Sequence, residues 1–387
     1  MAWRESSVVE ERLRFVVAAS RKEKPVTELC GEFGVSRQTG YNWLRRYEAG
    51  GSSQVTDRSR RPLHSPARAS EEVEKEVVAL RCQYPDWGAP KLTVLLRKRK
   101  PDCTICERTV HRILVRHNLL HQQDRHSPAT QRFERRAPNE LWQMDFKGPQ
   151  GFNKSSPVGP LSIIDDHSRY LICLHHLGST GAHGVQQSLR QAFEDVGVPE
   201  AMLVDHGTPW WNAASPWGIT GLTIWILQQG VRLLYSGVRH PQTQGKVERM
   251  HGALQRAVRR RKADPENQQW LDSFRHEYNY VRPHAAIGMT VPATRWRPSE
   301  RPYRPHPGEW AHPASAEIRR LGGQGQLNWR NRRWEISNAL RGQLVGIQVI
   351  GERAIVYFCN APMRELDLIA KLARPIPIDV LSRSLQY

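Results

Sequence analysis

Leu141-Trp142-Gln143-Met144-Asp145-Phe146 is the stretch that decides the fold, because it places a carboxylate inside an apolar run. Short apolar runs of this kind are typical of buried β-strands. A carboxylate in a buried strand costs free energy unless a cation or a hydrogen-bond donor meets it. We therefore expect a central sheet that carries a functional acid at Asp145.

Two further acids stand in positions that favour the same site. Asp205 follows the apolar run 201–204 and precedes Gly207, and acids at strand ends with a glycine turn behind them are common in α/β active sites. Glu248 lies beside the apolar stripe of an expected helix over 243–260. Three converging carboxylates would suit two Mg²⁺ ions. Taken singly, the acids could instead be a satisfied core group, a turn former and half of a surface ion pair.

The region 140–295 reads as one α/β domain. Hairpin-linked strands followed by alternating strands and helices predict a mixed sheet. The apolar insert 217–227 predicts an extra helix or a contact surface. The expected strands are 142–146, 158–164, 170–174, 201–204 and 231–235, and the expected helices are 183–196, 243–260 and 267–280.

The charge of the 387-residue chain restricts its partners. It has 57 Lys and Arg against 38 Asp and Glu, a net charge of +19, which attracts polyanions such as nucleic acid or anionic membrane. We see no run of about 20 apolar residues and no apolar signal-peptide core, so we expect a soluble, intracellular, nucleic-acid-binding protein. The alternative is a basic protein with some general housekeeping role.

Residues 1–50 predict a helix-turn-helix domain. Pro25 opens a second helix, Gly34 supplies a turn, and Ser36 caps a third helix over 37–47. Polar side chains near the start of that helix are of the types that read base edges in a DNA groove. A three-helix interaction module is the alternative. The candidate DNA contacts are Arg37, Gln38, Thr39, Asn42 and Arg45.

A second helical module is expected after a flexible basic linker. The linker is 51–69, the second helix-turn-helix-like domain is 70–120, and another basic linker covers 121–139. Two modules in tandem would read a longer DNA site than one. The further DNA-contact candidates here are Arg58, Arg60, Arg61, Lys91 and Arg108.

The six cysteines are scattered, as reduced intracellular thiols usually are. Cys103 and Cys106 precede His111 and His117, a pattern that could suggest zinc. We disfavour zinc because the gap to His111 is short and Cys106 falls where a helix N-cap is due.

The C-terminal part reads as a proline-rich linker over 296–316 and a small β-barrel with a tail over 317–387. Several arginines stand among its tryptophans, so both DNA binding and subunit contact are plausible for it. The expected strands are 325–329, 333–336, 343–349 and 354–358.

Five short motifs occur in an order that resembles the insertion-sequence DDE transposases with a retroviral-integrase-type, RNase H-like catalytic core. The resemblance covers about 140–300 strongly and the helical N-terminus moderately. The motifs are Trp142-Gln143-Met144-Asp145, 164–170 (IDDHSRY), 204–207 (VDHG), 240–249 (HPQTQGKVER), and Tyr278-Asn279-Tyr280 with Arg282-Pro283-His284.

The resemblance implies that Asp145, Asp205 and Glu248 are the catalytic residues and hold two Mg²⁺ ions, with Mn²⁺ as a substitute. It implies an enzyme that binds the terminal inverted repeats of its element, cleaves 3′ ends by hydrolysis and joins them to target DNA without a covalent protein–DNA intermediate. It also implies an SH3-like fold for the C-terminal barrel. The expected partners are double-stranded DNA and further copies of the chain, as a homodimer or higher oligomer on DNA, with no membrane. The expected place of action is the bacterial cytoplasm, at the nucleoid.

The sequence departs from the family pattern in three places. His206 stands where the family often has Asn; together with Gln244 we expect it to support the metal ligands by hydrogen bonds. The spacing from Asp205 to Glu248, with 206–247 between them, is longer than in the retroviral relatives. The lysines that follow the glutamate in retroviral integrases are missing, so Lys246, Arg249 and Arg256 are expected to take over phosphate contacts.

Other charged residues of the core have a less specific pattern. Arg259 and Arg260 belong to a basic run at the end of the Glu248 helix, where phosphate contact competes with simple stabilisation by the helix dipole. Asp165 and Asp166 are expected to be structural. A DNA-binding regulator with an inactive core and a structure-specific nuclease are the alternative functions.

Overall fold

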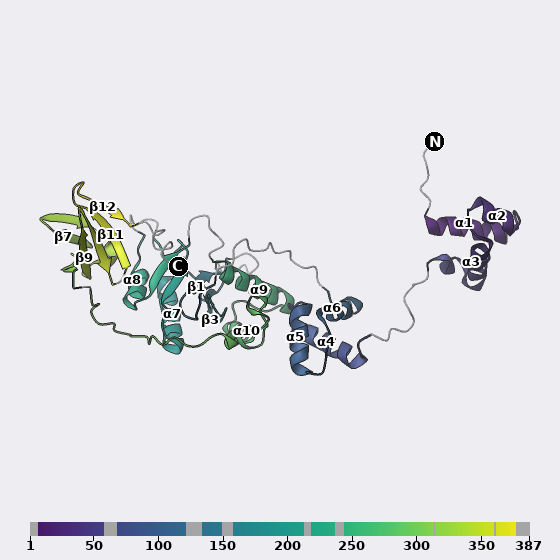
Figure 1. The fold of residues 1–387 in the computed structure, drawn as a ribbon, viewed down its shortest axis with the longest axis horizontal. Coiled ribbons are helices and arrows are strands. Elements are labelled where there is room, and N and C mark those ends of the chain that lie inside the picture. The colour runs from purple at the N-terminus through teal and green to yellow at the C-terminus, as the bar shows by residue number, and fades with distance from the viewer. Residues whose placement is uncertain are drawn as a thin grey trace. The chain divides into compact units, whose positions relative to one another are not determined.

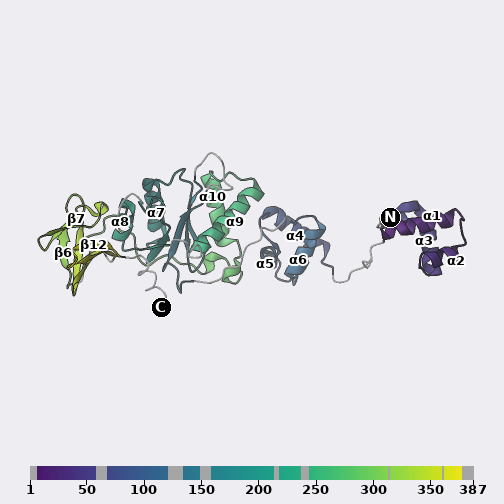
Figure 2. The ribbon, with the colours of Figure 1, turned by 90° about the horizontal axis from the view of Figure 1, so that it is seen from above.

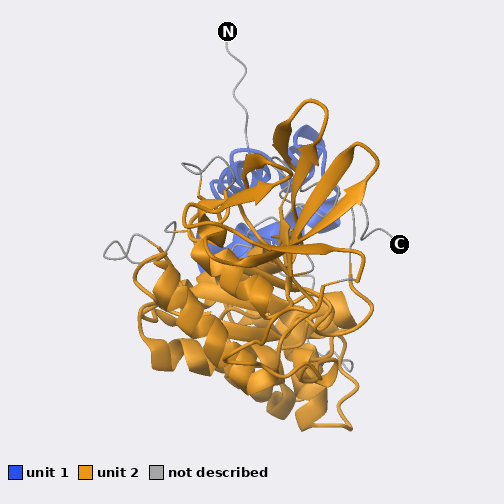
Figure 3. Ribbon diagram, turned by 90° about the vertical axis from the view of Figure 1, so that its left-hand side faces the viewer, with its two compact units in different colours: residues 1–68 blue, residues 69–387 orange. Residues whose placement is uncertain are grey.

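The computed structural model describes residues 7–57, 68–120, 134–148, 158–212, 218–236, 244–312, 314–359 and 361–376. The chain divides into two compact units, residues 1–68 and 69–387 (Figure 3). Arg58, Arg60, Arg61 and residues 240–243 of the 240–249 motif lie outside the described residues. Within the described ranges, no helix has the length and apolar character needed to cross a membrane.

The first unit is the expected helix-turn-helix: α1 Val8–Ser20, α2 Val26–Glu32 and α3 Arg37–Gly50. Ser36 caps α3 by accepting a hydrogen bond from the Thr39 amide. Gly40 lets α3 approach α2 closely, since a Cβ at this position would lie 2.6 Å from the Cys30 Sγ of α2. The expected linker start at 51 is wrong: Gly51–Val55 forms a 3₁₀ helix, η1, and Val55 is fully buried against α1–α3.

The second unit begins with another three-helix module: α4 Glu71–Gln83, α5 Ala89–Arg99 and α6 Glu107–Arg116. Cys106 is the N-cap residue of α6, as its position in the sequence predicts. The helices share one apolar core, because each presents residues at helical spacing to the others. Its fully buried members include Leu80, Trp87, Leu92, Leu96 and Ile113.

The central sheet has the strand order β3-β2-β1-β4-β5, which is that of an RNase H-like core. Figure 1 labels β1 and β3 of this sheet. The first three strands pair antiparallel, and β4 pairs parallel to both β1 and β5. The expected mixed sheet is therefore found, with strand limits that differ by up to three residues. The strands are β1 Trp142–Phe146, β2 Leu161–Asp165, β3 Leu171–His175, β4 Ala201–Val204 and β5 Arg232–Tyr235.

Helices cover both faces of this sheet (Figure 2). One face packs against α7 Ala182–Val196 and α8 Gly221–Gln228, and α8 comes from the apolar insert noted in the sequence. The other face packs against α9 Gly245–Arg261 and α10 Gln268–Tyr280. Short 3₁₀ helices follow: η3 Ala285–Ile287, η4 Pro292–Thr294 and, in the C-terminal part, η5 Asn338–Leu340.

Two expected linkers are partly built into this core, so their boundaries at 121–139 and 296–316 are wrong. Glu134 pairs with Arg169 and with Arg295 at 2.8 Å each. The indole of Trp296 stacks on Tyr170 with ring centroids 4.1 Å apart. Arg301 donates to the carbonyl groups of residues 199 and 230. Polar and proline-rich composition identified these stretches as linkers, but specific contacts hold them to the sheet.

The C-terminal part forms an open sheet, not the closed SH3-like barrel that we expected. Its order is β12-β11-β10-β9-β6, with β12 and β6 at the two edges, and β7 and β8 form a separate hairpin. Strand-like runs in the sequence predict strands but do not predict closure, which depends on pairing between the edges. The strands are β6 Glu317–Arg320, β7 Gln326–Trp329, β8 Arg332–Glu335, β9 Leu344–Ile350, β10 Arg353–Phe358, β11 Ala361–Asp367 and β12 Leu372–Pro375.

Asp165 provides a test of how the core is held together. It is fully buried and accepts hydrogen bonds from the amides of Asn139 and Ser168, at 2.7 and 2.8 Å, and from the Ser168 hydroxyl at 2.6 Å. Asp165→Ala leaves these donors without an acceptor, so we expect a loss of about 2–4 kcal/mol in the free energy of unfolding by urea. The exposed Asp102→Ala serves as the control. A loss below about 0.5 kcal/mol in Asp165→Ala would contradict the structural role.

Candidate active site

Parallel pairing of β1 and β4 brings Asp145 and Asp205 to the carboxyl ends of two neighbouring strands. Gln143 is the register partner of Leu203, and each acid lies two residues beyond this pair. Neighbouring strands are about 4.8 Å apart, so the two acids leave the sheet side by side. Asp205 is further oriented by its own turn, because its Oδ1 accepts a hydrogen bond from the Gly207 amide at 3.0 Å.

Glu248 reaches the same region from α9. It lies in the first turn of that helix, whose buried residues Val247 and Met250 pack on the sheet. The side chain of Glu248 itself is exposed. It therefore lies next to the face of α9 that packs on the sheet, as the apolar stripe predicts.

The electrostatics of Asp145 involve both of the other acids. Its pKa is raised from 3.8 to about 7, first by burial and then by the negative charges of Asp205 and Glu248. A hydrogen bond from the Phe146 amide and the charge of Lys147 oppose this rise without cancelling it. The charges of Asp205 and Glu248 thus act on Asp145, and the assignment of the three acids as catalytic residues stays a prediction.

This donor set suits a hard divalent cation. All three side chains offer carboxylate oxygens, the ligands that Mg²⁺ prefers, and a cation would offset the burial and the repulsion that together raise the pKa of Asp145. In the described part of the chain, no three His, Cys, Asp or Glu side chains are gathered closely enough to hold a metal ion together. The charges of Asp205 and Glu248 therefore act on Asp145, but the three side chains do not form a closed set of ligands in the described structure.

His251 is a neighbour of the acids that the sequence analysis missed. Its Nδ1 lies 3.8 Å from Asp145 Oδ2, and its Nε2 lies 3.0 Å from the hydroxyl of Ser162, the register partner of Asp145 on β2. Burial, aided by the charge of Lys147, lowers the pKa of His251 to about 3, so the ring is neutral and forms no ion pair with Asp145. Its position one turn after Glu248 on the same helix is the signal that could have identified it.

His206 and Gln244, the expected hydrogen-bonding supports, occupy different environments. The ring of His206 packs against Trp211 and Tyr235, with centroids 5.1 and 5.3 Å away. Gln244 is the N-cap residue of α9 and is only 9% exposed. Its side-chain nitrogen is buried without a hydrogen-bond partner in the part of the protein that is described. A support role for either residue stays a prediction.

Asp166 and Lys246 form a buried ion pair, and this bears on one predicted phosphate contact. Asp166 also accepts hydrogen bonds from the Gln143 side chain at 2.9 Å and the Arg135 amide at 2.8 Å. Burial lowers the pKa of Lys246 to about 8, against the attraction of Asp166. Asp166 is thus structural, as expected, and Lys246 would have to leave it to contact phosphate.

The other predicted DNA contacts are divided between surface and interior. On α3, Arg37, Gln38, Asn42 and Arg45 are exposed, whereas Thr39 is half-buried at the helix start. In the second unit, Arg108, Arg249 and Arg259 are exposed, and Lys91, Arg256 and Arg260 are half-buried. Burial, together with the charges of Arg282 and Arg256, lowers the pKa of Lys91 to about 8.

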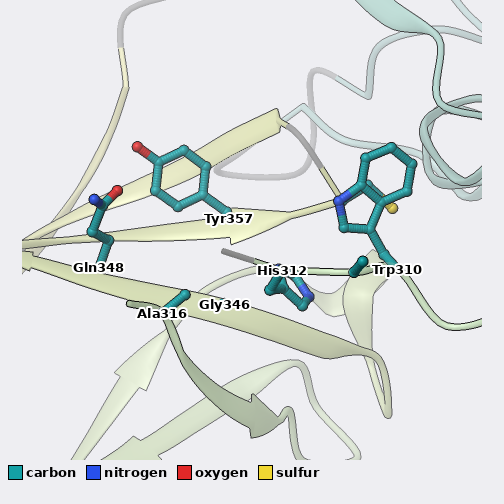
Figure 4. A pocket seen from close by; sticks show the side chains of 8 residues that line it. Trp310, His312, Ala316, Gly346, Gln348 and Tyr357 are labelled. Atoms are coloured by element: carbon teal, nitrogen blue, oxygen red, sulfur yellow. The ribbon is translucent and has the colours of Figure 1, made fainter. Parts of the chain in front are cut away.

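A separate pocket lies in the C-terminal sheet. Its cavity of about 480 Å³ is lined by Trp310 and His312 on one side and by Gly346, Gln348 and Tyr357 of β9 and β10 on the other (Figure 4). None of the three acids lines it. The candidate active site is therefore defined by the carboxylates, and not by this cavity.

Four family models match the chain. Two are described as integrase core domains and match residues 135–241 and 229–292. A helix-turn-helix domain matches residues 11–62, and a homeodomain-like domain matches residues 39–114. The integrase core and the helix-turn-helix domains that the motifs indicated are confirmed.

One curated relative is the Insertion element IS476 uncharacterized 39.2 kDa protein of Xanthomonas euvesicatoria. It is 24% identical over 245 residues, which is 59% of this chain and 65% of the relative. The chain thus matches just under two thirds of that protein's length.

Solved structures with similar chains come from retroviruses. The simian T-cell lymphotropic virus intasome, in complex with PP2A regulatory subunit B56 gamma, has a chain that is 16% identical, covering 78% of this chain and 99% of its own, with a TM-score of 0.37. The HTLV-2 integrase catalytic core, in complex with magnesium, is 12% identical and covers 41% of this chain and 97% of its own, with a TM-score of 0.32. The BIV integrase core is 21% identical and covers 40% and 92%, with a TM-score of 0.31.

Replacing Asp145 should stabilise the metal-free protein in a pH-dependent way. The folded-state pKa of Asp145, about 7, lies above the ordinary value of 3.8, so the folded protein holds this proton more tightly than the unfolded chain. The resulting contribution to the free energy of unfolding is full below pH 3.8 and is lost as the pH rises through about 7. Asp145→Asn mimics the protonated carboxyl and should exceed the wild type by up to about 2–4 kcal/mol at pH 8, and by less at pH 5. Urea unfolding with a chelator present measures this difference.

The control for this experiment is Asp102→Asn, which changes an exposed acid of the same unit. Its stability relative to the wild type should be the same at both pH values. Equal stabilisation by Asp145→Asn at pH 5 and pH 8 would show that Asp145 is not held among negative charges.

Proposed function

We propose that this chain, an insertion-sequence DDE transposase by its integrase core and helix-turn-helix domains, binds the terminal inverted repeats of its element, cleaves their 3′ ends by hydrolysis and joins them to target DNA. The observation that carries the proposal is the raised pKa of Asp145, caused by burial together with the charges of Asp205 and Glu248. A partly buried acid whose pKa is shifted by burial and by neighbouring charges is a common sign of a catalytic site. The integrase core matches over residues 135–292 support the reaction class.

The three acids are proposed to hold two Mg²⁺ ions, with Mn²⁺ as a substitute. Ions bound there supply a lowered pKa for the attacking water or 3′-hydroxyl and charge stabilisation for the leaving oxygen. The protein's part is to hold its own ligands in place. β1 and β4 set the spacing of Asp145 and Asp205, and the Gly207 amide orients the Asp205 carboxylate.

The His251 ring beside Asp145 does not compete with a cation for the carboxylate. His251 is neutral, because burial lowers its pKa to about 3, so it adds no positive charge that would compete for Asp145. The Ser162 hydroxyl holds the ring on the side of β2 at 3.0 Å from its Nε2. We propose that this pair keeps Asp145 in a fixed position between the strands.

Double-stranded DNA is the proposed partner at several points of the chain. The net charge of +19 and two helical modules support contact with a long stretch of duplex. Since two ends of an element must be joined together, we propose a homodimer or higher oligomer assembled on DNA. The proposed place of action is the bacterial nucleoid, where this substrate lies.

The activity prediction concerns the three acids on a labelled element end with Mg²⁺ or Mn²⁺. Asp145→Asn, Asp205→Asn and Glu248→Gln should each lower cleavage and strand transfer by about 10³-fold, since stabilisation of several kcal/mol by the ions is lost. Binding to the end should stay within a few fold of the wild type. Gel assays of cleaved and joined products, with a parallel binding titration, measure both effects.

Glu194→Gln, which changes an exposed acid on α7, is the matched control and should keep full activity. Activity that survives in any one of the three variants refutes the assignment of that residue. Cleavage without joining in the wild type would favour a structure-specific nuclease instead. A wild type that binds DNA but has no activity with either ion would favour a regulator with an inactive core.

A further inference from the structure

A fully buried carboxylate joins the second helical module to the catalytic core. Asp86 lies in the turn between α4 and α5, and its side chain is 0% exposed. Arg261 contacts its Oδ1 through Nη2 at 2.6 Å and through Nε at 3.0 Å. Arg282 contacts its Oδ2 at 3.1 Å. Both arginines belong to the core, so one acid of the module accepts hydrogen bonds from two separate core segments.

The surroundings of Asp86 extend this contact into an interface. Arg261 also binds Glu277 of α10, at 2.6 and 2.8 Å. Burial by itself would lower the pKa of the Arg261 guanidinium. The hydrogen bonds and charges of Glu277 and Asp86 outweigh burial, so this pKa is raised. The fully buried Trp87 lies under the guanidinium of Arg282, 5.8 Å from its ring centroid. Val281 of the core packs against the apolar core of the module.

One helix connects this interface to the candidate active site. Glu248 lies in the first turn of α9 and Arg261 is its last residue. At about 1.5 Å per residue, the two positions are roughly 20 Å apart along the axis. The buried residues of α9 hold it to the sheet along most of this length, so it acts as a rigid spacer.

We propose that Asp86, Arg261 and Arg282 are positioning residues. They hold the second helical module at a fixed distance from the three acids, and so determine which phosphodiester is cut relative to the DNA sequence that this module binds. The inference rests on the proposed function for its DNA substrate. Paired hydrogen bonds from a planar guanidinium restrict orientation as well as distance, which a purely apolar contact does not do as strictly.

The activity test maps the cleavage position at single-nucleotide resolution on a labelled element end, using the full chain. The wild type should cut at one position. Asp86→Asn keeps the shape but removes the charge, and should spread the cuts over neighbouring positions while the affinity for DNA stays within about 2-fold. Arg282→Gln removes only one of the two partners and should show a weaker spread. It also provides a milder variant in case Asp86→Asn does not fold, which circular dichroism checks.

Glu76→Gln is the matched control, because it breaks the exposed ion pair with Arg99 inside the same module. It should cut at the wild-type position. A folded Asp86→Asn or Arg282→Gln that also cuts only at that position would overturn the proposal.

A second measurement needs no catalysis. Spin labels on the exposed Cys82 of α4 and on a cysteine introduced at the exposed Asp264, with the other cysteines that react replaced by serine, report the distance between module and core. The wild type should give a narrow distance distribution, and Asp86→Asn a distribution at least about 2-fold broader. Equal widths would overturn the proposal. If the wild type cuts no DNA but Asp86→Asn still broadens the distance distribution, the docking role is supported and only the proposed function is contradicted.

Discussion

The partial burial of the Asp145 carboxylate, with the charges of two further acids acting on it, is the constraint on which the rest of this structure depends. Asp145 is placed on a central strand by the apolar residues around it, and parallel pairing with β4 brings Asp205 beside it. Burial and the charges of Asp205 and Glu248 raise the pKa of Asp145 to about 7. Such an arrangement lowers the stability of the metal-free fold. It is typical of sites where a bound cation or substrate compensates for that loss.

Comparison with the other buried acids makes this interpretation specific. Asp165 is met by two amides and a hydroxyl, Asp166 by Lys246, and Asp86 by two arginines. Those three acids are satisfied by the protein and hold segments together. Asp145 instead lies beside a neutral His251, and the charges of Asp205 and Glu248 raise its pKa against the opposing charge of Lys147. A buried carboxylate is therefore informative about function only once its partners are known.

Much of the architecture could be predicted because it depends on local pattern. The strand and helix positions of the core, the Ser36 cap and the helix within the 217–227 insert all follow from spacing and residue type. Predicted boundaries failed where composition was the only guide. Residues 51–55, 134–139 and 296–301 look like linkers, yet Val55, Asn139 and Arg301 are held by contacts with residues far away in the chain. The open C-terminal sheet differed from the expected barrel for the same reason.

The sequence by itself determined the basic character that suits DNA and predicted the three acids and the order of the domains, because these depend on residue identity and short-range spacing. The tertiary structure alone decided which acids repel each other, that His251 lies beside Asp145, and that Lys246 is paired with Asp166. It alone also showed that Asp86 docks the second module on α9. These features depend on burial and on contacts between residues that are distant in the chain, and neither can be read from spacing along it.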